Sequence, residues 1–488
     1  MLLILSIVPF ALAVALSTSA SSSLHVPLTA LHARQYSQDI TVRQSWLLGQ
    51  ARAMRSKYAA HLDERGQQLL RRDEESVFEK KRWRGRSTGT VSLIDIGLDA
   101  SYAVILDTGS ADLWVAGSSC SASFCAQTPT YATQSSSSFQ STGQAFNVSY
   151  GSGSAEGYVG KDTVSMAGYT VPDQALGVVT TTSVNLITHP LSGLMGLAFK
   201  KVASSDETPF WQSLASSGNW NSPEMGVYLN RFRGDPSANR IEMNGGEIIF
   251  GGLNSDKFNG SVNYISISDS DRDYWRIPLE AMTVQGKSVD IVSSVFLASL
   301  TDTKTSSINS GNPQCAIDTG TTLIGVPASV ASAIYSQIKG SEPLGASTGY
   351  EGYYQYPCNT AVSVTLQFGG LSYSISNADM NLGTFTKDTS KCTGAFFAMD
   401  LSSRSPIQWI VGASFIKNVY TSFRYSPTAI GFAELHGGSS VSPGNSSSIT
   451  RSRSSSKSSG ISTVASCHSR LMLLALGFMA VILAFQDA

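Results

Sequence analysis

The stretch Ala103-Val-Ile-Leu-Asp-Thr-Gly-Ser110 ends an apolar run with one carboxylate, a glycine and two hydroxyls. The glycine permits a tight turn that would present Asp107 at the end of the run. A second copy, Cys315-Ala-Ile-Asp-Thr-Gly-Thr321, carries Asp318 in the same place. The two aspartates are 211 positions apart, so only a fold that brings two halves of the chain face to face can make them neighbours.

A second pair of matching segments supports two similar halves. Leu194-Met-Gly196 and Ile410-Val-Gly412 each place two apolar residues before a glycine. That glycine follows the aspartate by 89 positions in the first half and by 94 positions in the second. Repetition at comparable spacing predicts two related lobes.

The body of the chain, from Gly89 to Leu435, consists mainly of short β-prone runs separated by Gly, Ser, Asn and Asp, which is typical of strands and turns. The best helix in this part is 328–338. These features predict an all-β fold of two lobes, an N-terminal lobe over residues 83–270 and a C-terminal lobe over residues 271–436. The predicted strands include 89–96, 146–150, 246–250, 261–267, 361–368 and 422–433.

Charge divides the 488 residues into three parts, although the net charge is only −1. Residues 24–86 carry 13 Lys/Arg against 7 Asp/Glu, residues 87–436 carry 17 against 27, and residues 437–470 carry 4 against none. The body is therefore acidic, whereas phosphate contacts need a basic face. We expect no nucleic-acid partner.

The N-terminal part has the features of a targeting and leader segment. Residues 1–20 form an apolar run that ends in small residues, which predicts a signal peptide. Residues 21–82 form a basic leader in which apolar residues recur at helical spacing from Trp46 to Leu62. Arg71-Arg72 and Lys80-Lys81-Arg82 are candidate sites for a kexin-type processing protease, or ordinary surface charges of a helix.

The C-terminal part changes to Gly and Ser, which predicts a Ser-rich stalk over residues 437–458. The fifteen-residue apolar run 471–485 is shorter than the ~20 residues that span a bilayer. Together with small residues and a polar spacer, residues 459–488 predict a GPI-attachment signal with Ser458 as the attachment site. The alternative is a tail-anchored transmembrane helix. Either places the protein in the secretory pathway, anchored outside the plasma membrane or in the cell wall.

Six cysteines are too widely spread for a zinc cluster, and a secretory protein favours disulfides. We expect the pairs Cys120–Cys125 and Cys358–Cys392. Cys315 and Cys467 have no evident partner, and Cys315 is either paired elsewhere or a buried free thiol. The N-x-S sequons, candidates for glycosylation, begin at Asn147, Asn259 and Asn445.

Two carboxylates that share one proton supply an acid and a base, because like charge raises one of the two pKa values. Such a pair can activate a water and protonate a carbonyl oxygen, which is what peptide hydrolysis at acidic pH requires. This chemistry needs no metal and no cofactor. The groups that we expect to carry or support it are Asp107, Asp318, Gly109, Ser110, Gly320 and Thr321.

The body resembles the pepsin-like aspartic proteases, and among them the fungal secreted and GPI-anchored members, from about Gly89 to Leu435. The segments Asp107-Thr-Gly-Ser-Ala-Asp-Leu-Trp-Val115 and Cys315-Ala-Ile-Asp-Thr-Gly-Thr-Thr-Leu323 match the two active-site turns of that family. Tyr150-Gly-Ser-Gly153 resembles its flap. The resemblance implies a bilobal aspartic endopeptidase that binds protein or peptide substrates in a cleft, as a monomer.

The resemblance also implies roles for the flap and the leader. Tyr150 would be the flap tyrosine, on a mobile hairpin tip with Gly151 and Gly153, and its hydroxyl would reach toward Trp114; a plain aromatic core is the alternative. The leader would be the protein's own inhibitory propeptide, with Lys57-Tyr58 as the segment that blocks the two aspartates. The alternative function is a catalytically silent binding or cell-wall protein of the same fold.

Overall fold

The computed structural model describes residues 24–31, 39–79, 90–97, 100–150, 153–183, 186–187, 189–232, 241–292, 311–345, 349–438 and 442–443. The predicted signal peptide, most of the stalk and the whole predicted attachment signal lie outside the described residues, and so do Gly151 and Lys80-Lys81-Arg82. Within the described ranges, no helix is both long and apolar enough to cross a membrane.

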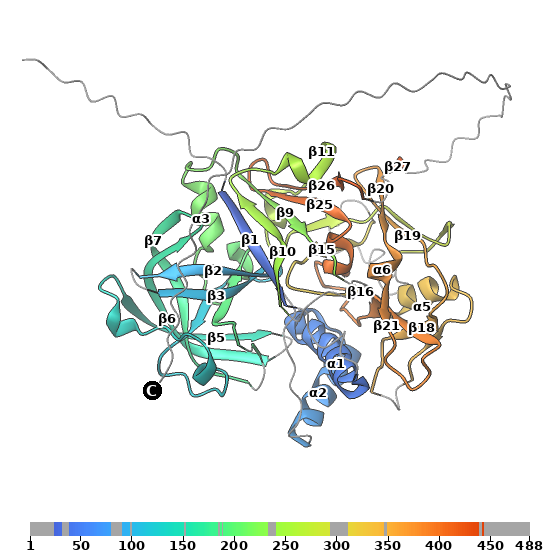
Figure 1. Ribbon diagram of the computed structural model, residues 1–488, viewed down its shortest axis with the longest axis horizontal. Helices are drawn as coiled ribbons and strands as arrows, with labels where there is room; N and C mark the ends of the chain where they lie inside the picture. Colours follow the sequence, from blue (N-terminus) through green and yellow to red (C-terminus); the bar gives the residue numbers. More distant parts are fainter. Residues whose placement is uncertain are drawn as a thin grey trace, which may run out of the picture. The chain divides into compact units, whose positions relative to one another are not determined.

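Strands dominate the described part of the chain, as predicted, and they form four sheets there (Figure 1). The largest runs in the order β11 (Phe258–Ser266), β26 (Ala429–Leu435), β25 (Val419–Arg424), β9 (Glu224–Leu229), β10 (Ile241–Phe250), β1 (Leu24–Leu31), β2 (Thr90–Ile96), β3 (Ala100–Asp107), β8 (Gly193–Gly196), β4 (Leu113–Ala116), β7 (Tyr169–Thr182), β6 (Gly153–Met166) and β5 (Gln140–Tyr150).

The other three sheets belong to the second half of the body. One contains β12 (Arg276–Pro278), β15 (Gln314–Ile317), β24 (Trp409–Val411), β16 (Ile324–Val326) and β23 (Phe396–Ala398). Another contains β14 (Lys287–Ser288), β13 (Ala281–Val284), β19 (Val364–Phe368), β20 (Leu371–Ile375) and β27 (Ser442–Pro443). The last contains β17 (Glu342–Pro343), β18 (Tyr354–Pro357), β22 (Lys391–Gly394) and β21 (Asn381–Gly383).

The repeat in the sequence corresponds to the same strand arrangement in both halves. β3 pairs in parallel with β8, which places Asp107 opposite Gly196. β15 pairs in parallel with β24, which places Ile317, the residue before Asp318, opposite Val411. In each half, therefore, the strand that leads to an aspartate lies beside the apolar-Gly segment that follows it by about ninety positions.

The leader begins with a strand that the sequence analysis did not predict. β1 pairs with β10 over most of its length and with β2 at Thr29 and Ala30, so it lies inside the largest sheet (Figure 1). Its side chains alternate, because Val26 and Leu28 are buried while Pro27 is exposed. Strand alternation of this kind buries one face of a segment against the core.

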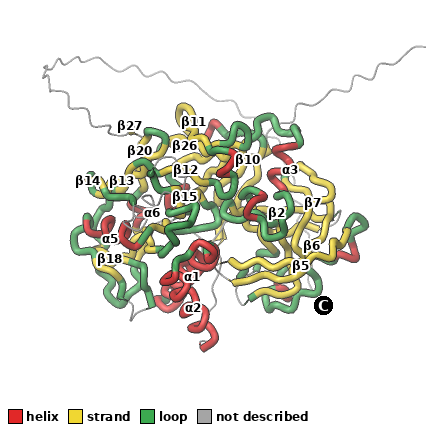
Figure 2. The backbone as a smooth tube through the Cα atoms, turned by 180° about the vertical axis from the view of Figure 1, so that it is seen from behind, coloured by secondary structure: helices red, strands yellow, loops and turns green. Residues whose placement is uncertain are grey.

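The predicted helical part of the leader is α1 (Ile40–Lys57), which is followed by α2 (Glu64–Glu79). Asp39 caps α1, because its side chain accepts a hydrogen bond from Thr41 N at 2.8 Å. Figure 2 shows both helices together at the edge of the strands. The apolar residues of the predicted period are buried in the core, namely Trp46, Leu47, Ala51, Met54, Tyr58 and Leu62. The α-helices of the body within the described residues are α3 (Phe210–Ser216), α5 (Ala328–Ser336), α6 (Asn377–Met380) and α7 (Ala413–Ile416).

One predicted strand, 422–433, is wrong, because this segment contains a turn between β25 and β26. β25 ends at Arg424 and β26 begins at Ala429, and the two pair antiparallel. Pro427 lies in the turn, where its missing N–H breaks no ladder. The apolar residues on either side of Pro427 resemble one continuous strand in the sequence.

Two disulfides join cysteines of the described part of the chain, Cys120–Cys125 and Cys358–Cys392. They join the two pairs expected from the sequence. Cys315 is a buried free thiol in β15, and burial raises its pKa well above the ordinary value. Its thiol is therefore neutral and serves as an apolar packing group.

Candidate active site

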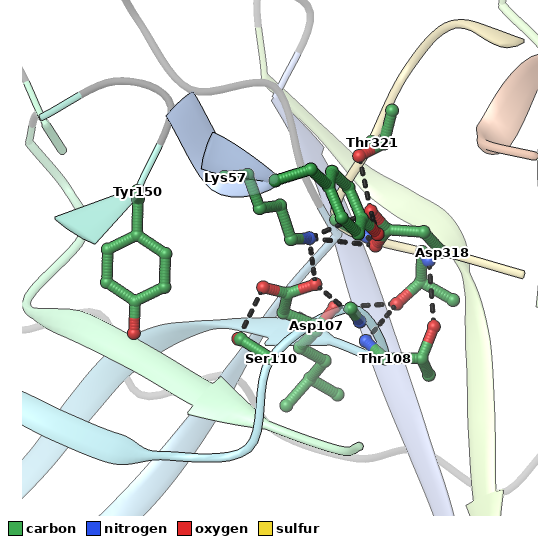
Figure 3. A network of polar contacts seen from close by, with 12 residues as sticks. Lys57, Asp107, Thr108, Ser110, Tyr150, Asp318 and Thr321 are labelled. Atoms are coloured by element: carbon green, nitrogen blue, oxygen red, sulfur yellow. Dashed lines mark hydrogen bonds and ion pairs between the residues drawn. The ribbon is translucent and has the colours of Figure 1, made fainter. Parts of the chain in front are cut away.

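The first carboxylate of the site is that of Asp107, at the end of β3. It is 2 % exposed and accepts hydrogen bonds from the turn that follows it. Gly109 N donates to Asp107 Oδ1 at 2.9 Å, and Ser110 Oγ donates to Oδ2 at 2.6 Å (Figure 3). The expected glycine and hydroxyl thus each hold one carboxylate oxygen.

The second carboxylate repeats this arrangement after β15. Asp318 is fully buried, and its Oδ1 accepts a hydrogen bond from Gly320 N at 2.9 Å. Its Oδ2 accepts a short hydrogen bond from Thr321 Oγ1 (Figure 3). A Cβ at position 320 would overlap the Asp107 carboxylate, and one at position 109 would overlap that of Asp318. The two glycines are therefore needed because each carboxylate lies against the opposite turn.

The middle threonines of the two motifs join the turns directly. Thr319 N donates to Thr108 Oγ1 at 2.9 Å, and Thr108 N donates to Thr319 Oγ1 at 3.1 Å. Each hydroxyl also donates across the pair, Thr108 to Ile317 O at 2.8 Å and Thr319 to Leu106 O at 3.0 Å. The sequence analysis did not single out these residues. The signal was present, because both motifs carry threonine at the same place.

The leader places a lysine on both carboxylates. Lys57 Nζ lies 2.6 Å from Asp107 Oδ1 and 2.9 Å from both Asp318 oxygens (Figure 3). Tyr58 OH donates to Asp318 Oδ2 at 2.9 Å. These are the two residues that the sequence analysis named as the blocking segment. In this structure both side chains lie directly against the carboxylates.

Burial and charge separate the pKa values of the two aspartates. Burial raises the pKa of Asp107, Lys57 opposes the rise and Asp318 adds to it, so that the pKa lies above its ordinary value. Burial acts in the same direction at Asp318, but Lys57 and the hydrogen bond from Thr321 lower its pKa below the ordinary value. Burial disfavours the charge of Lys57, yet the two carboxylates raise its pKa. The lysine therefore stays protonated.

The predicted flap tyrosine lies at the end of β5, opposite Gly153 in the β5–β6 hairpin. Trp114 Nε1 donates to Tyr150 OH at 2.9 Å, and the ring centroids are 6.2 Å apart. The side chain is 6 % exposed, and burial raises its pKa well above the ordinary value. On the main chain, Ser56 Oγ donates to Tyr150 O at 2.6 Å, so the leader also holds the hairpin.

Of the remaining predicted positions, the described ones are exposed. Asn147 is exposed on β5 and Asn259 is exposed on β11. Arg71-Arg72 lies within α2, on its exposed side. Among the residues that the structure describes, no group of three or more His, Cys, Asp or Glu is placed to hold a metal ion.

Comparison with known proteins agrees with this geometry. The family model described as eukaryotic aspartyl protease matches residues 91–435. The chain is 65% identical over 442 residues to "Major aspartyl peptidase 1" of Cryptococcus neoformans var. grubii, covering 87% of this chain and 88% of that protein.

More distant relatives show the same similarity over the body. "Aspartic protease" of Phaffia rhodozyma is 31% identical over 363 residues, covering 72% of this chain and 80% of the relative. "Pepsin A" of Sus scrofa is 30% identical over 347 residues, covering 70% and 80%. With its two Asp-Thr-Gly turns joined at their threonines, the chain belongs to the eukaryotic aspartyl protease family.

Proposed function

We propose that Asp107 and Asp318 are the catalytic dyad of this aspartic endopeptidase, which hydrolyses peptide bonds of proteins at acidic pH. The observation that carries the assignment is that one ammonium group contacts both carboxylates, at 2.6 and 2.9 Å. This contact supports the assignment, because two carboxylates that share one ammonium group are close enough to act together on a single water and a single carbonyl.

The reaction follows from two buried carboxylates that share one proton. Like charges this close cannot both ionise freely, so one group keeps the proton while the other is ionised. The ionised carboxylate takes a proton from the attacking water, and the protonated one gives its proton to the carbonyl oxygen. Ser110 and Thr321 hold the outer oxygens by hydrogen bonds, which orients both groups.

The test is the pair of isosteric variants Asp107→Asn and Asp318→Asn, each of which removes one acid-base group. We expect each to lower kcat by at least about 10³-fold, because acid and base act in the same step. The assay is hydrolysis of an internally quenched peptide near pH 4 by the processed protein, with and without a statine-type inhibitor.

Asp269→Asn is the matched control, because Asp269 has an 87%-exposed side chain and pairs only with Arg272 in the described part of the chain. Appreciable activity in either dyad variant contradicts the assignment. Inactivity of the parent favours the silent binding protein instead.

Tyr150 is proposed as the flap residue that closes over a bound substrate. It ends β5, its hydroxyl accepts a hydrogen bond from Trp114, and its main-chain carbonyl accepts one from Ser56, the residue before Lys57. A hairpin tip of this kind can open for substrate and then exclude water. The position of the Tyr150 ring supports this role, and the hydrogen bond from Trp114 fixes the direction of the ring.

The leader, residues 21–82, is proposed as an inhibitory propeptide. Lys57 and Tyr58 block the dyad, and Ser56 holds the flap hairpin. The basic leader also complements the acidic body, which favours its binding at neutral pH. Processing after Lys80-Lys81-Arg82 would yield a body of two lobes, 83–270 and 271–436, whereas processing after Arg71-Arg72 would leave residues 73–82 on that body.

Secretion and anchoring are further parts of the proposal. Residues 1–20 would direct the chain to the secretory pathway, where exposed Asn147 and Asn259 could receive glycans, and residues 459–488 would direct a GPI anchor to Ser458. Release of active enzyme from cells by a phosphatidylinositol-specific phospholipase would support the anchor. Retention after that treatment would support a transmembrane tail.

A further inference from the structure

The leader binds the second half of the body through one glutamate. Arg65 Nη2 lies 2.9 Å from Glu351 Oε1, and Arg72 Nη1 lies 2.9 Å from Glu351 Oε2. Each carboxylate oxygen thus holds one guanidinium group, and both groups belong to the segment that processing would remove. Partial burial opposes ionisation of this glutamate, but the two arginines lower its pKa.

A third leader arginine lies deeper at the same place. Arg55 is only 3 % exposed, its Nη2 donates to Glu351 O at 2.9 Å, and its Cζ lies 4.8 Å from the centroid of the Phe397 ring. Asp400 completes the surroundings, since its Oδ2 lies 3.6 Å from Arg65 Nε. Carboxylates, a carbonyl and an aromatic face together are the groups that recognise a guanidinium.

The body holds Glu351 in place without help from the leader. The next residue, Gly352, has φ +97°, and a Cβ there would lie 2.7 Å from the Phe397 ring. Only glycine adopts that conformation in so little space, so the turn is fixed against β23. The turn that carries Glu351 therefore stays against Phe397 when the leader leaves, and the arginines of the leader do not.

This place and the dyad are contacted by neighbouring residues of one leader helix. Arg55 and Lys57 belong to the same helix, two residues apart, which separates their Cα atoms by only about 5–6 Å. Lys57 reaches the two aspartates, while Arg55 reaches the main-chain carbonyl of Glu351 and the Phe397 ring. A peptide held at the dyad would bring a side chain to the same place within about three residues of the bond that is cut.

We infer that Glu351, Phe397 and Asp400 form a subsite that binds an arginine side chain of the substrate near the scissile bond. We call these three residues the Glu351 subsite. Before processing, the leader's arginines fill it. The inference rests on the proposed function, because it assigns substrate preference to the same active site.

The experiment compares peptides that differ in one charge. The full chain is secreted from a yeast host, the processed enzyme is isolated, and kcat/KM is measured at pH 5 for quenched peptides carrying arginine or its neutral isostere citrulline. The arginine is moved through the four positions on each side of the scissile bond. We expect about a tenfold preference for arginine at one position, the size of one charge-assisted hydrogen bond.

Variants then assign the preference to the subsite. Glu351→Gln should reduce the arginine-to-citrulline ratio of kcat/KM to near one. Glu342→Gln is the matched control and should keep the preference, because Glu342 is half exposed and pairs with Lys391 at 3.4 Å. Glu351→Lys should invert the preference, favouring a peptide with glutamate at that position.

The outcomes separate the two proposals. Equal cleavage of arginine and citrulline peptides at every position overturns the subsite and leaves the dyad intact. An arginine preference that survives in Glu351→Gln also overturns the subsite. If no peptide is cleaved and no statine-sensitive activity exists, the proposed function fails, and the subsite fails with it.

Discussion

Lys57 is the residue on which inhibition by the leader depends most directly. Its ammonium group is the shared partner of two buried carboxylates, and removing one member of a buried ion pair typically costs about 3–5 kcal/mol. We therefore expect Lys57→Ala to weaken leader binding and to give measurable peptide hydrolysis by the unprocessed chain near pH 6. Lys201→Ala, at a side chain that is 60% exposed, is the control. The role of Lys57 is wrong if the variant is as inert as the parent.

His61 should make leader binding sensitive to mild acid. Its Nε2 lies 3.0 Å from Tyr274 OH, and burial lowers its pKa below 6.5, with Asp273 opposing the shift. His61 binds a proton more readily in the released leader than in the docked leader. The leader therefore binds the body less tightly as the pH falls through about 6.5. We expect His61→Gln to keep the leader bound to a lower pH than the parent.

The measurement is cleavage of the released leader by an added protease at pH steps from 7 to 4. Docking that depends on Glu351 is also weakened by acid, but in a lower pH range. The lowered pKa of that carboxylate means that its contribution is complete above about 4.5 and is lost as the pH falls through the depressed value. An unchanged release profile in His61→Gln between pH 7 and 5 would show that this histidine plays no part.

Helix α2 packs so closely on the body that there is no room for a side chain at Gly66. A Cβ at Gly66 would lie 2.6 Å from Asp400 O. Alanine usually stabilises a helix by about 1 kcal/mol relative to glycine, but here the overlap should dominate and weaken leader binding. Gly49→Ala in α1 is the matched control, because a Cβ there meets nothing within 4 Å.

Both glycine variants are compared by the pH at which half of the leader is released. We expect Gly66→Ala to release its leader at a higher pH than the parent and Gly49→Ala at the same or a lower pH. If Gly66→Ala behaves like Gly49→Ala, the close contact with Asp400 does not limit docking.

Elements whose own sequence shows a clear pattern were predictable, whereas elements whose hydrogen-bond partners lie far away along the chain were not. The apolar period of the leader predicts α1 because a helix satisfies its own backbone. β1 escaped prediction because its hydrogen bonds go to β10, more than two hundred positions away. In the same way, Asp107 and Asp318 could be identified from their motifs, whereas Glu351 could not, because only the fold brings leader arginines to it.

The largest sheet connects the leader to both halves of the body. It contains β1, and also β25 and β26 from the second half beside strands of the first. The repeat predicts two related lobes, but it carries no information about a sheet that both lobes share. The shared sheet forms because strands at a sheet edge pair with other strands, and these pairings depend on the folded chain as a whole.

The unprocessed molecule should depend on β1 for its stability, and the processed molecule should not. Leu28 is 1 % exposed, and Leu→Ala in a core typically costs about 2–5 kcal/mol. We expect Leu28→Ala to lower the melting temperature of the unprocessed chain by roughly 4–10 °C and to leave that of the processed enzyme unchanged. Differential scanning calorimetry of both forms measures this. A lowered melting temperature in the processed form would mean that β1 remains in the sheet after cleavage.

The four hydrogen bonds between Thr108 and Thr319 and the adjacent main chain involve no atom of the leader. The spacing of the two carboxylates is therefore a property of the body alone, and it does not need to be created when the lysine leaves. Polar groups that are already oriented require little reorganisation energy when charge develops on a substrate. Removing the leader thus uncovers a preorganised site, and the switch from inert to active is a change in access and charge with the catalytic geometry kept constant.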